Sequence, residues 1–161
     1  MNSIQIDVKK NNAKYILITG GLGYIGSHTC IELLKEYDKI IVIDNLSNSS
    51  IFVIDRIKKI SNVDINFIHG DILDKEKLED LFKNYNIKAV IHFAGHKSVS
   101  ESVKNPIKYY RNNVLGSLIL IEVMKKYDCK RIVFSSSATV YGQPKDVPVT
   151  ENSSLQPINP Y

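Results

Sequence analysis

A glycine-rich segment between a short apolar run and an amphipathic stretch is the strongest constraint on how this 161-residue chain folds. The apolar run covers residues 15–19, and the glycines follow it as Gly21-x-Gly23-x-x-Gly26 and, overlapping, as Gly20-x-x-Gly23-x-x-Gly26. Glycine lets the backbone turn tightly and approach a diphosphate, and a following helix N-terminus supplies free amides and a partial positive charge. A strand, a glycine turn and a helix in this order favour a dinucleotide-binding βαβ unit over a turn without a ligand.

Short apolar runs recur along the chain in alternation with amphipathic stretches. The runs lie at residues 15–19, 39–43, 65–68, 88–93 and 131–134. Apolar side chains in the stretches between them recur three or four residues apart, which is the spacing of one helix face. Helices on both sides of a parallel sheet bury its strands and give such runs. We therefore expect an α/β fold of three layers, a doubly wound parallel sheet of the Rossmann type, with ligands beyond the carboxyl ends of the strands.

The chain length is that of one domain, and we expect a polar lead-in over residues 1–14 followed by a dinucleotide-binding domain over residues 15–161. The longest predicted helix begins with Asn105 as N-cap and Pro106 in its first turn and runs to about residue 127. Its predicted buried face carries Val114, Leu118, Ile121 and Met124. From residue 142 onward, four prolines leave little room for a long regular element.

Acidic and amide side chains follow the second and third apolar runs. Asp44 ends the second run about 20 residues after the glycine loop, where a carboxylate accepts hydrogen bonds from the adenosine ribose and repels a 2′-phosphate. This position favours NAD over NADP. Asn45, Asn48 and Ser49 either add hydrogen bonds to the cofactor or form a polar turn. Asp71 either accepts from the adenine amino group, which we favour, or caps the next turn.

Composition and residue spacing argue against several kinds of partner for this chain, namely nucleic acid, membrane and metal. The 21 Lys and Arg residues are scattered among 17 acids, which argues against a nucleic-acid partner. No apolar run approaches the ~18–20 residues that cross a bilayer, so we expect no membrane partner. Cys30 and Cys129 show no CxxC spacing, which favours a reducing compartment such as the cytoplasm. The four histidines lack metal-ligand spacing, so we assign no metal, and we interpret His92 as a packed core histidine.

Six segments together carry a resemblance to a known family. They are TGGLGYIGSHT, DNLSNS, GDI, HFAGHKSVSESV, YYRNNVLG and SSSATVYG, in this order. From about Lys14 to Tyr161 the chain resembles the extended short-chain dehydrogenase/reductase family and, more narrowly, its nucleotide-sugar 4-epimerases. The glycine motif is common to the whole superfamily, whereas the fourth and sixth segments are much narrower signals.

The resemblance implies NAD as cofactor, a UDP-sugar as substrate, and interconversion of UDP-glucose and UDP-galactose through a 4-keto intermediate. It implies Tyr161 as the catalytic base and Ser137 as a catalytic and substrate-binding residue that hydrogen-bonds the 4-oxygen of the sugar. The residues that it assigns to the cofactor are Gly20, Gly23, Tyr24, Ile25, Gly26, Asp44, Asn45, Asn48, Ser49, Asp71, Ile72, Phe93, Ala94, Gly95, Lys97 and Asn112.

The family pattern also places a lysine four residues after the catalytic tyrosine, and a sugar-binding region after that. We therefore expect this chain to be the N-terminal, cofactor-binding part of a longer enzyme, inactive by itself and binding NAD weakly or not at all. Alternatives are a 4,6-dehydratase or uronate epimerase of the same family, or a non-catalytic NAD-binding module. A dehydratase needs an acid/base pair where Ala138 and Thr139 stand. Homodimer formation and acceptance of N-acetylated sugars stay open.

Overall fold

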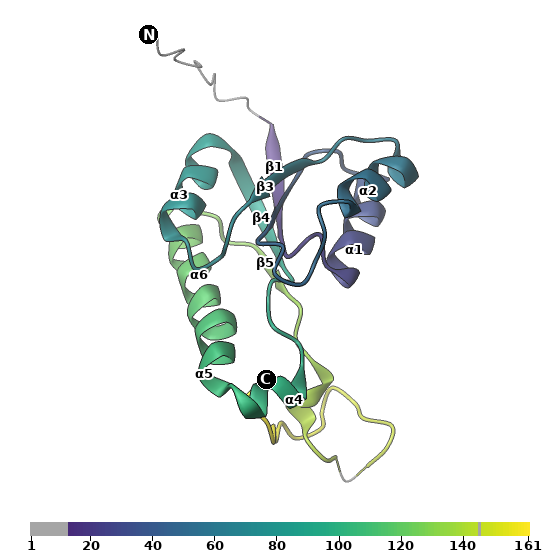
Figure 1. Ribbon diagram of the computed structural model, residues 1–161, viewed down its shortest axis with the longest axis vertical. Helices are drawn as coiled ribbons and strands as arrows, with labels where there is room; N and C mark the ends of the chain where they lie inside the picture. The colour runs from purple at the N-terminus through teal and green to yellow at the C-terminus, as the bar shows by residue number, and fades with distance from the viewer. Residues whose placement is uncertain (1–12, 145) are drawn as a thin grey trace, which may run out of the picture.

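The computed structural model describes residues 13–144 and 146–161, and its centre is a parallel sheet (Figure 1). The strands are β1 (Lys14–Thr19), β2 (Ile40–Asp44), β3 (Asn66–His69), β4 (Asn86–His92) and β5 (Ile132–Phe134), in the spatial order β3-β2-β1-β4-β5. The order reverses between β1 and β4, and this is the place where doubly wound sheets bind ligands. The predicted fold class is confirmed. The polar lead-in expected over residues 1–14 lies almost entirely outside the described residues.

Helices cover both faces of this sheet, which gives the three expected layers (Figure 1). On one face lie α1 (Tyr24–Leu34) and α2 (Val53–Ser61), and on the other lie α3 (Lys75–Asn84) and α6 (Gly116–Lys126). Successive strand residues point to opposite faces, so Leu17 and Ile41 belong to the core under α3 and α6, whereas Ile18 and Val42 belong to the core under α1 and α2. Burial on both faces explains why β2 is apolar at four consecutive positions.

The long helix expected from Pro106 to residue 127 is interrupted. It consists of α5 (Pro106–Tyr109), a π-helical segment, η1 (Tyr110–Leu115), and α6, and it is preceded by the separate helix α4 (Val99–Lys104). Pro106 lies in the first turn of α5 as expected, but the side chain of Asn105 makes no capping hydrogen bond there. Single π turns inside α-helices are frequent at functional sites.

The predicted buried face of this helix is wrong except at Met124. Val114, Leu118 and Ile121 are 49%, 52% and 50% exposed, and the residues that pack on the sheet are Leu120, Val123 and Met124. The helix carries apolar side chains on both faces, so spacing alone does not identify the buried one. The π turn also adds a residue, which rotates the following side chains about the helix axis.

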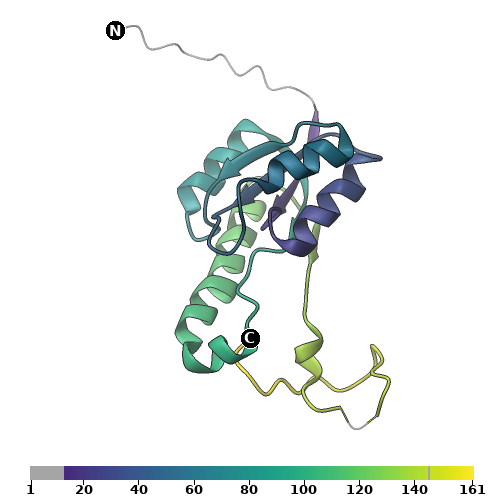
Figure 2. The ribbon, with the colours of Figure 1, turned by 45° about the vertical axis from the view of Figure 1, so that its right-hand side comes forward.

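The chain after β5 has little regular structure, as the prolines predicted. It leaves the sheet, forms the short 3-10 helix η2 (Ala138–Tyr141), and returns so that Tyr161 lies between α4 and α5 (Figures 1 and 2). β5 is the edge strand next to β4, and its side chains Ile132, Val133 and Phe134 are exposed. Within residues 13–144 and 146–161, no helix combines the length and hydropathy that crossing a membrane requires.

We predict that Leu120→Ala lowers the free energy of unfolding by about 2–5 kcal/mol, because it leaves a cavity in the core under α6. The control variant Lys125→Ala shortens an exposed side chain on the same helix and should change the value by less than about 1 kcal/mol. Urea unfolding of both variants checks this. Equal losses in the two variants would contradict the observed helix register.

Candidate cofactor-binding site

The glycine turn between β1 and α1 needs its glycines for two different reasons. Gly20 has φ of +66°, and a Cβ there would lie 2.7 Å from the backbone nitrogen of Ala94 in the loop after β4. At Gly26 a Cβ would lie 2.3 Å from the carbonyl oxygen of Gly20. α1 starts directly after Gly23, and no side chain in the described part of the chain caps it. The first amides of α1 therefore remain available to an anionic group.

A cleft of about 380 Å³ lies over the carboxyl ends of the strands, next to this turn. Most of the predicted cofactor residues line it: Gly20, Gly23, Tyr24, Ile25, Gly26, Asp44, Asn45, Asn48, Ile72, Phe93, Ala94, Gly95, Lys97 and Asn112. Four further lining residues, Ile43, Ser47, Gly70 and His96, were missed in the sequence. Each of them lies within or beside a segment that the family resemblance had already marked.

Asp44 connects two walls of the cleft. One carboxylate oxygen accepts from the backbone N–H of Leu22 in the glycine turn at 3.0 Å. The other accepts from the N–H of Leu46 at 2.9 Å and from the hydroxyl of Ser49 at 2.8 Å. A carboxylate has about four acceptor positions, so one remains for a ligand hydroxyl. Ser49 is not among the lining residues and acts here on Asp44, while its contact with the cofactor stays a prediction.

Asp71 accepts from the side-chain amide of Asn45 at 2.9 Å and from the N–H of Leu73 at 2.9 Å. It therefore caps the next turn, which was one of the two alternatives, and its contact with adenine stays a prediction. Asp71 lines a second cleft of about 640 Å³. The residues that line both clefts are Asn45, Ser47, Asn48, His96, Lys97 and Asn112. The two clefts form adjoining parts of one groove along the strand ends.

The π-helical segment holds the loop after β4. The side chain of Asn113 accepts from the N–H of His96 at 2.8 Å and donates to the carbonyl of His96 at 2.9 Å. Asn112 donates to the same Asn113 oxygen at 2.8 Å and also lines the cleft. Asn113 was missed in the sequence, although its place beside Asn112 in the YYRNNVLG segment offered a signal.

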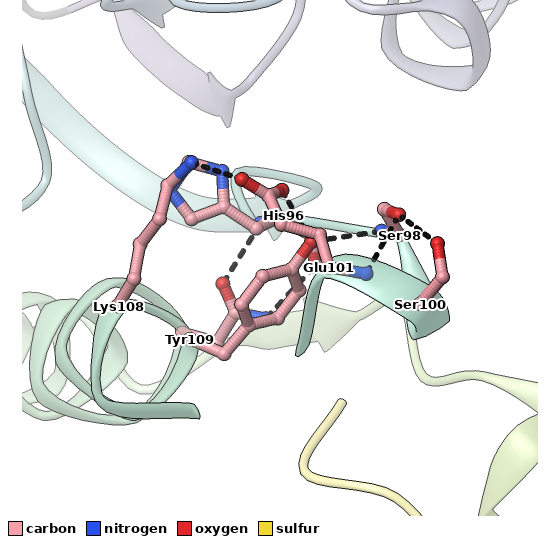
Figure 3. Close-up of polar contacts among 7 residues, drawn as sticks. His96, Ser98, Ser100, Glu101, Lys108 and Tyr109 are labelled. Carbon is pink, nitrogen blue, oxygen red and sulfur yellow. Dashed lines mark hydrogen bonds and ion pairs between the residues drawn. The ribbon is translucent and has the colours of Figure 1, made fainter. Parts of the chain in front are cut away.

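A polar cluster joins α4 to α5 at the end of the groove (Figure 3). The buried Tyr109 donates to one oxygen of Glu101 at 2.9 Å and accepts from the N–H of Ser98 at 3.1 Å. Lys108 donates to the other oxygen of Glu101 at 2.6 Å. Its hydrogen bond lowers the pKa of Glu101, and burial raises the pKa of Tyr109. This cluster fixes the start of α4, and with it the loop that lines the cleft.

The two residues predicted to be catalytic lie outside the cleft. Ser137 accepts from the N–H of Thr139 at 3.2 Å and so begins η2. The ring of Tyr161 meets the ring of Tyr109 edge-on, with 6.4 Å between the ring centroids. No hydrogen bond among the described residues joins Ser137 to Tyr161, so their joint action stays a prediction.

The sheet, the glycine turn and the cleft over the reversal of strand order define a dinucleotide-binding domain of the Rossmann type. The chain belongs to the family described as GDP-mannose 4,6 dehydratase, whose sequence model matches residues 17–161. It is 56% identical over 146 residues to the UDP-glucose 4-epimerase of Bacillus subtilis, covering 91% of this chain and 43% of the relative. It is 51% identical over 146 residues to the UDP-glucose 4-epimerase of Dictyostelium discoideum, covering 91% and 42%.

Solved structures show the same likeness. The UDP-glucose 4-epimerase of Bifidobacterium longum, in complex with NAD⁺ and UDP, superimposes with a TM-score of 0.88 at 48% identity, covering 91% of this chain and 44% of that one. The enzyme of Stenotrophomonas maltophila, with bound NAD and a formylated UDP-arabinopyranose, has a TM-score of 0.87 at 41% identity, covering 91% and 44%. The chain thus spans less than half the length of these relatives. The predicted resemblance to nucleotide-sugar 4-epimerases is confirmed.

His92 at the end of β4 gives a prediction on stability. It is 1% exposed, and burial, with a smaller effect from Lys97, lowers its pKa to about 4. The unfolded-state pKa is about 6.5, so folding favours the neutral imidazole. This contribution is complete above pH 6.5 and is lost as the pH falls from 6.5 to 4. We expect it to lower the free energy of unfolding by about 2 kcal/mol between pH 7 and pH 5.

Urea unfolding at the two pH values measures this decrease. His92→Gln should remove most of it, whereas His28→Gln, which changes an exposed histidine, should keep it. An equal pH dependence in the wild type and in His92→Gln would show that His92 does not cause the decrease.

Proposed function

We propose that residues 15–161 form the NAD-binding part of a UDP-glucose 4-epimerase. The observation that carries this proposal is the convergence of the glycine turn, Asp44 and the β4 loop on one cleft at the reversal of strand order. The relatives described above support the choice of substrate, since the Bifidobacterium structure holds NAD⁺ and UDP. Galactose metabolism is the corresponding context.

We assign different residues of the cleft to different parts of a bound dinucleotide. The amides at the start of α1 face the diphosphate, and the glycines permit its approach. Asp44 has one acceptor position left for the adenosine ribose, and a 2′-phosphate would meet its negative charge. We expect Asp71 and Ile72 to lie toward the adenine of a bound dinucleotide, and Lys97 and Asn112, which line the same groove, to contact its other end. NAD, when bound, supplies a reversible hydride acceptor.

Inversion at C4 of a hexose requires that the secondary alcohol become a ketone, because oxidation removes the stereocentre. The protein must accept the hydroxyl proton and keep the 4-keto sugar bound while the sugar rotates to present its opposite face. We assign proton transfer to Tyr161 and a hydrogen bond to the same oxygen to Ser137. A tyrosine with a pKa near 10 needs a nearby positive charge to act as a base at pH 7. The edge contact with Tyr109 holds the ring of Tyr161 against α5.

A 4,6-dehydratase is the second candidate, because the matching family carries that description. Ala138 and Thr139, which follow Ser137, offer no acid/base pair for the elimination of water. The epimerase is therefore the preferred assignment, and the products formed distinguish the two reactions.

We also propose that two copies of the chain associate. Ile107, Val114, Leu118 and Ile121 form an exposed apolar stripe along α5, η1 and α6, and a second copy would cover it. The two free, buried cysteines, Cys30 and Cys129, fit the reducing conditions of the cytoplasm, which we propose as the location.

Of the two expectations for the isolated chain, weak binding of NAD or none, the proposed site requires weak binding. Titration of the 161-residue chain with NAD up to millimolar concentrations, followed by NMR, should therefore move the backbone amide signals of residues 20–26. Asp44→Asn should weaken binding by about tenfold or more, because one charge-assisted hydrogen bond contributes ~1.5–3 kcal/mol. Asp55→Asn, on α2, is the matched control and should leave the affinity unchanged. Unmoved signals for residues 20–26 in the wild type would contradict the proposed site.

Catalysis can be tested in a fusion of residues 1–161 to the C-terminal part of the Bacillus subtilis relative. We expect it to convert UDP-galactose into UDP-glucose, and Tyr161→Phe to lower kcat about 10²–10⁴-fold. Tyr110→Phe changes an exposed tyrosine and serves as the control. A fusion that binds NAD and releases a 4-keto-6-deoxy sugar would establish the dehydratase instead, and one that binds NAD without any turnover would contradict both assignments.

Sedimentation equilibrium of the 161-residue chain should show a dimer. Leu118→Asp should shift it toward the monomer, because it places a charge in the apolar stripe. The control Lys59→Asp changes an exposed residue of α2 and should leave the dimer intact. A monomeric wild type would rule out the proposed association.

A further inference from the structure

A continuous series of hydrogen bonds runs beneath the cofactor cleft, from the loop after β4 to the π-helical segment. The N–H of Ala94 donates to Oγ1 of Thr19 at 3.2 Å, and this oxygen lies 2.6 Å from Nδ1 of His92. Nε2 of His92 lies 2.9 Å from Oγ of Ser117, which donates to the carbonyl oxygen of Asn113 at 2.5 Å. The series therefore joins β1, β4, η1 and α6 through the core.

One arrangement of protons gives every group in this series a hydrogen-bond partner. The hydroxyl of Ser117 donates a hydrogen bond to the carbonyl of Asn113, so the Ser117 oxygen accepts a hydrogen bond from Nε2–H of His92. Nδ1 of His92 then accepts from the hydroxyl of Thr19, whose oxygen accepts from Ala94. All donors and acceptors are satisfied when His92 is neutral with its proton on Nε2. The buried Thr19 and His92 thus form a fixed link rather than a set of separate contacts.

Both ends of the series reach the cleft, although His92 itself is 1% exposed and does not line it. At one end, the nitrogen of Ala94 lies against Gly20, where a Cβ would be 2.7 Å away. At the other end, Asn113 holds both backbone groups of His96. Backbone pairing already joins these two segments, because the N–H of Phe93 donates to the carbonyl oxygen of Thr19 at 3.0 Å. The link between Thr19 and Ser117 adds a side-chain contribution to the distance between the glycine turn and the loop at residues 94–96.

We propose that Thr19, His92 and Ser117 are positioning residues that set this distance and thereby the affinity for the dinucleotide. The proposal rests on the proposed function of the cleft. A role in core packing alone predicts a different outcome, because valine has the shape of threonine and would fill the space of Thr19 equally well. The hydroxyl, and not the shape, is the property that the positioning role requires.

The experiment is the NMR titration with NAD on the 161-residue chain, applied to Thr19→Val and Thr19→Ser. Thr19→Val removes one partner of both Ala94 and His92 and should weaken NAD binding by about tenfold. Thr19→Ser retains the hydroxyl and should bind within about twofold of the wild type. Ser61→Ala removes a similar hydroxyl, bonded to the carbonyl of Ile57 on α2, and is the matched control. Thermal unfolding verifies that each variant is folded.

A direct readout comes from the side-chain ¹⁵N signals of His92. The wild type should show a protonated Nε2 and an accepting Nδ1, and Thr19→Val should shift Nδ1 alone. A folded Thr19→Val with wild-type affinity overturns the proposal, and so does a wild type with its proton on Nδ1. If Thr19→Val does not fold, Ser117→Ala tests the other end with the same expected loss. A wild type that binds no NAD would instead refute the proposed function, and this inference with it.

Discussion

The carboxylate of Asp44 is the contact on which the cofactor cleft depends. It joins the N–H of Leu22 in the turn after β1 to the N–H of Leu46 after β2, and so connects two loops that the sheet alone would leave independent. Asp44 is 6% exposed, and three neutral hydrogen-bond donors stabilise its negative charge before any ligand binds. A residue expected from the sequence to bind a ribose therefore also builds the wall beside it.

The opposite wall is held by hydrogen bonds from helical residues rather than by a charge. Asn113, in the π-helical segment, binds both backbone groups of His96, and Asn112 donates to the same Asn113 oxygen. The glycine turn, the loop with Asp44 and the loop after β4 follow the first, second and fourth strands. Hydrogen bonds hold all three loops in place. Such a preformed site loses little conformational entropy on binding, which is the physical advantage of placing it on a rigid sheet.

Much of this arrangement could be predicted from sequence, because strands buried on both faces, glycine spacing and an acid after β2 are local patterns. The buried face of α6 could not, since Leu118 and Leu120 are equally apolar and only tertiary packing selects Leu120. The hydrogen-bonded link through His92 could not be predicted from the sequence either. Its partners Thr19 and Ser117 lie 73 and 25 residues away along the chain, and a buried histidine shows no partner in the sequence. His92 was correctly expected in the core, and its hydrogen bonds emerge only from the fold.

The cofactor cleft and the two residues proposed to act in catalysis differ in how deeply the chain around them is buried. The cofactor side lies on strand ends whose neighbours are buried, and the hydrogen bonds of Asp44 and Asn113 hold its loops. Ser137 and Tyr161 lie on the irregular chain after β5, whose side chains Val133 and Phe134 are more than half exposed. The ring of Tyr161 contacts the ring of Tyr109 on α5. Tyr109 is in turn hydrogen-bonded to Glu101 and to the N–H of Ser98. The two residues proposed to act in catalysis therefore lie on a less buried part of the chain than the residues of the cofactor cleft.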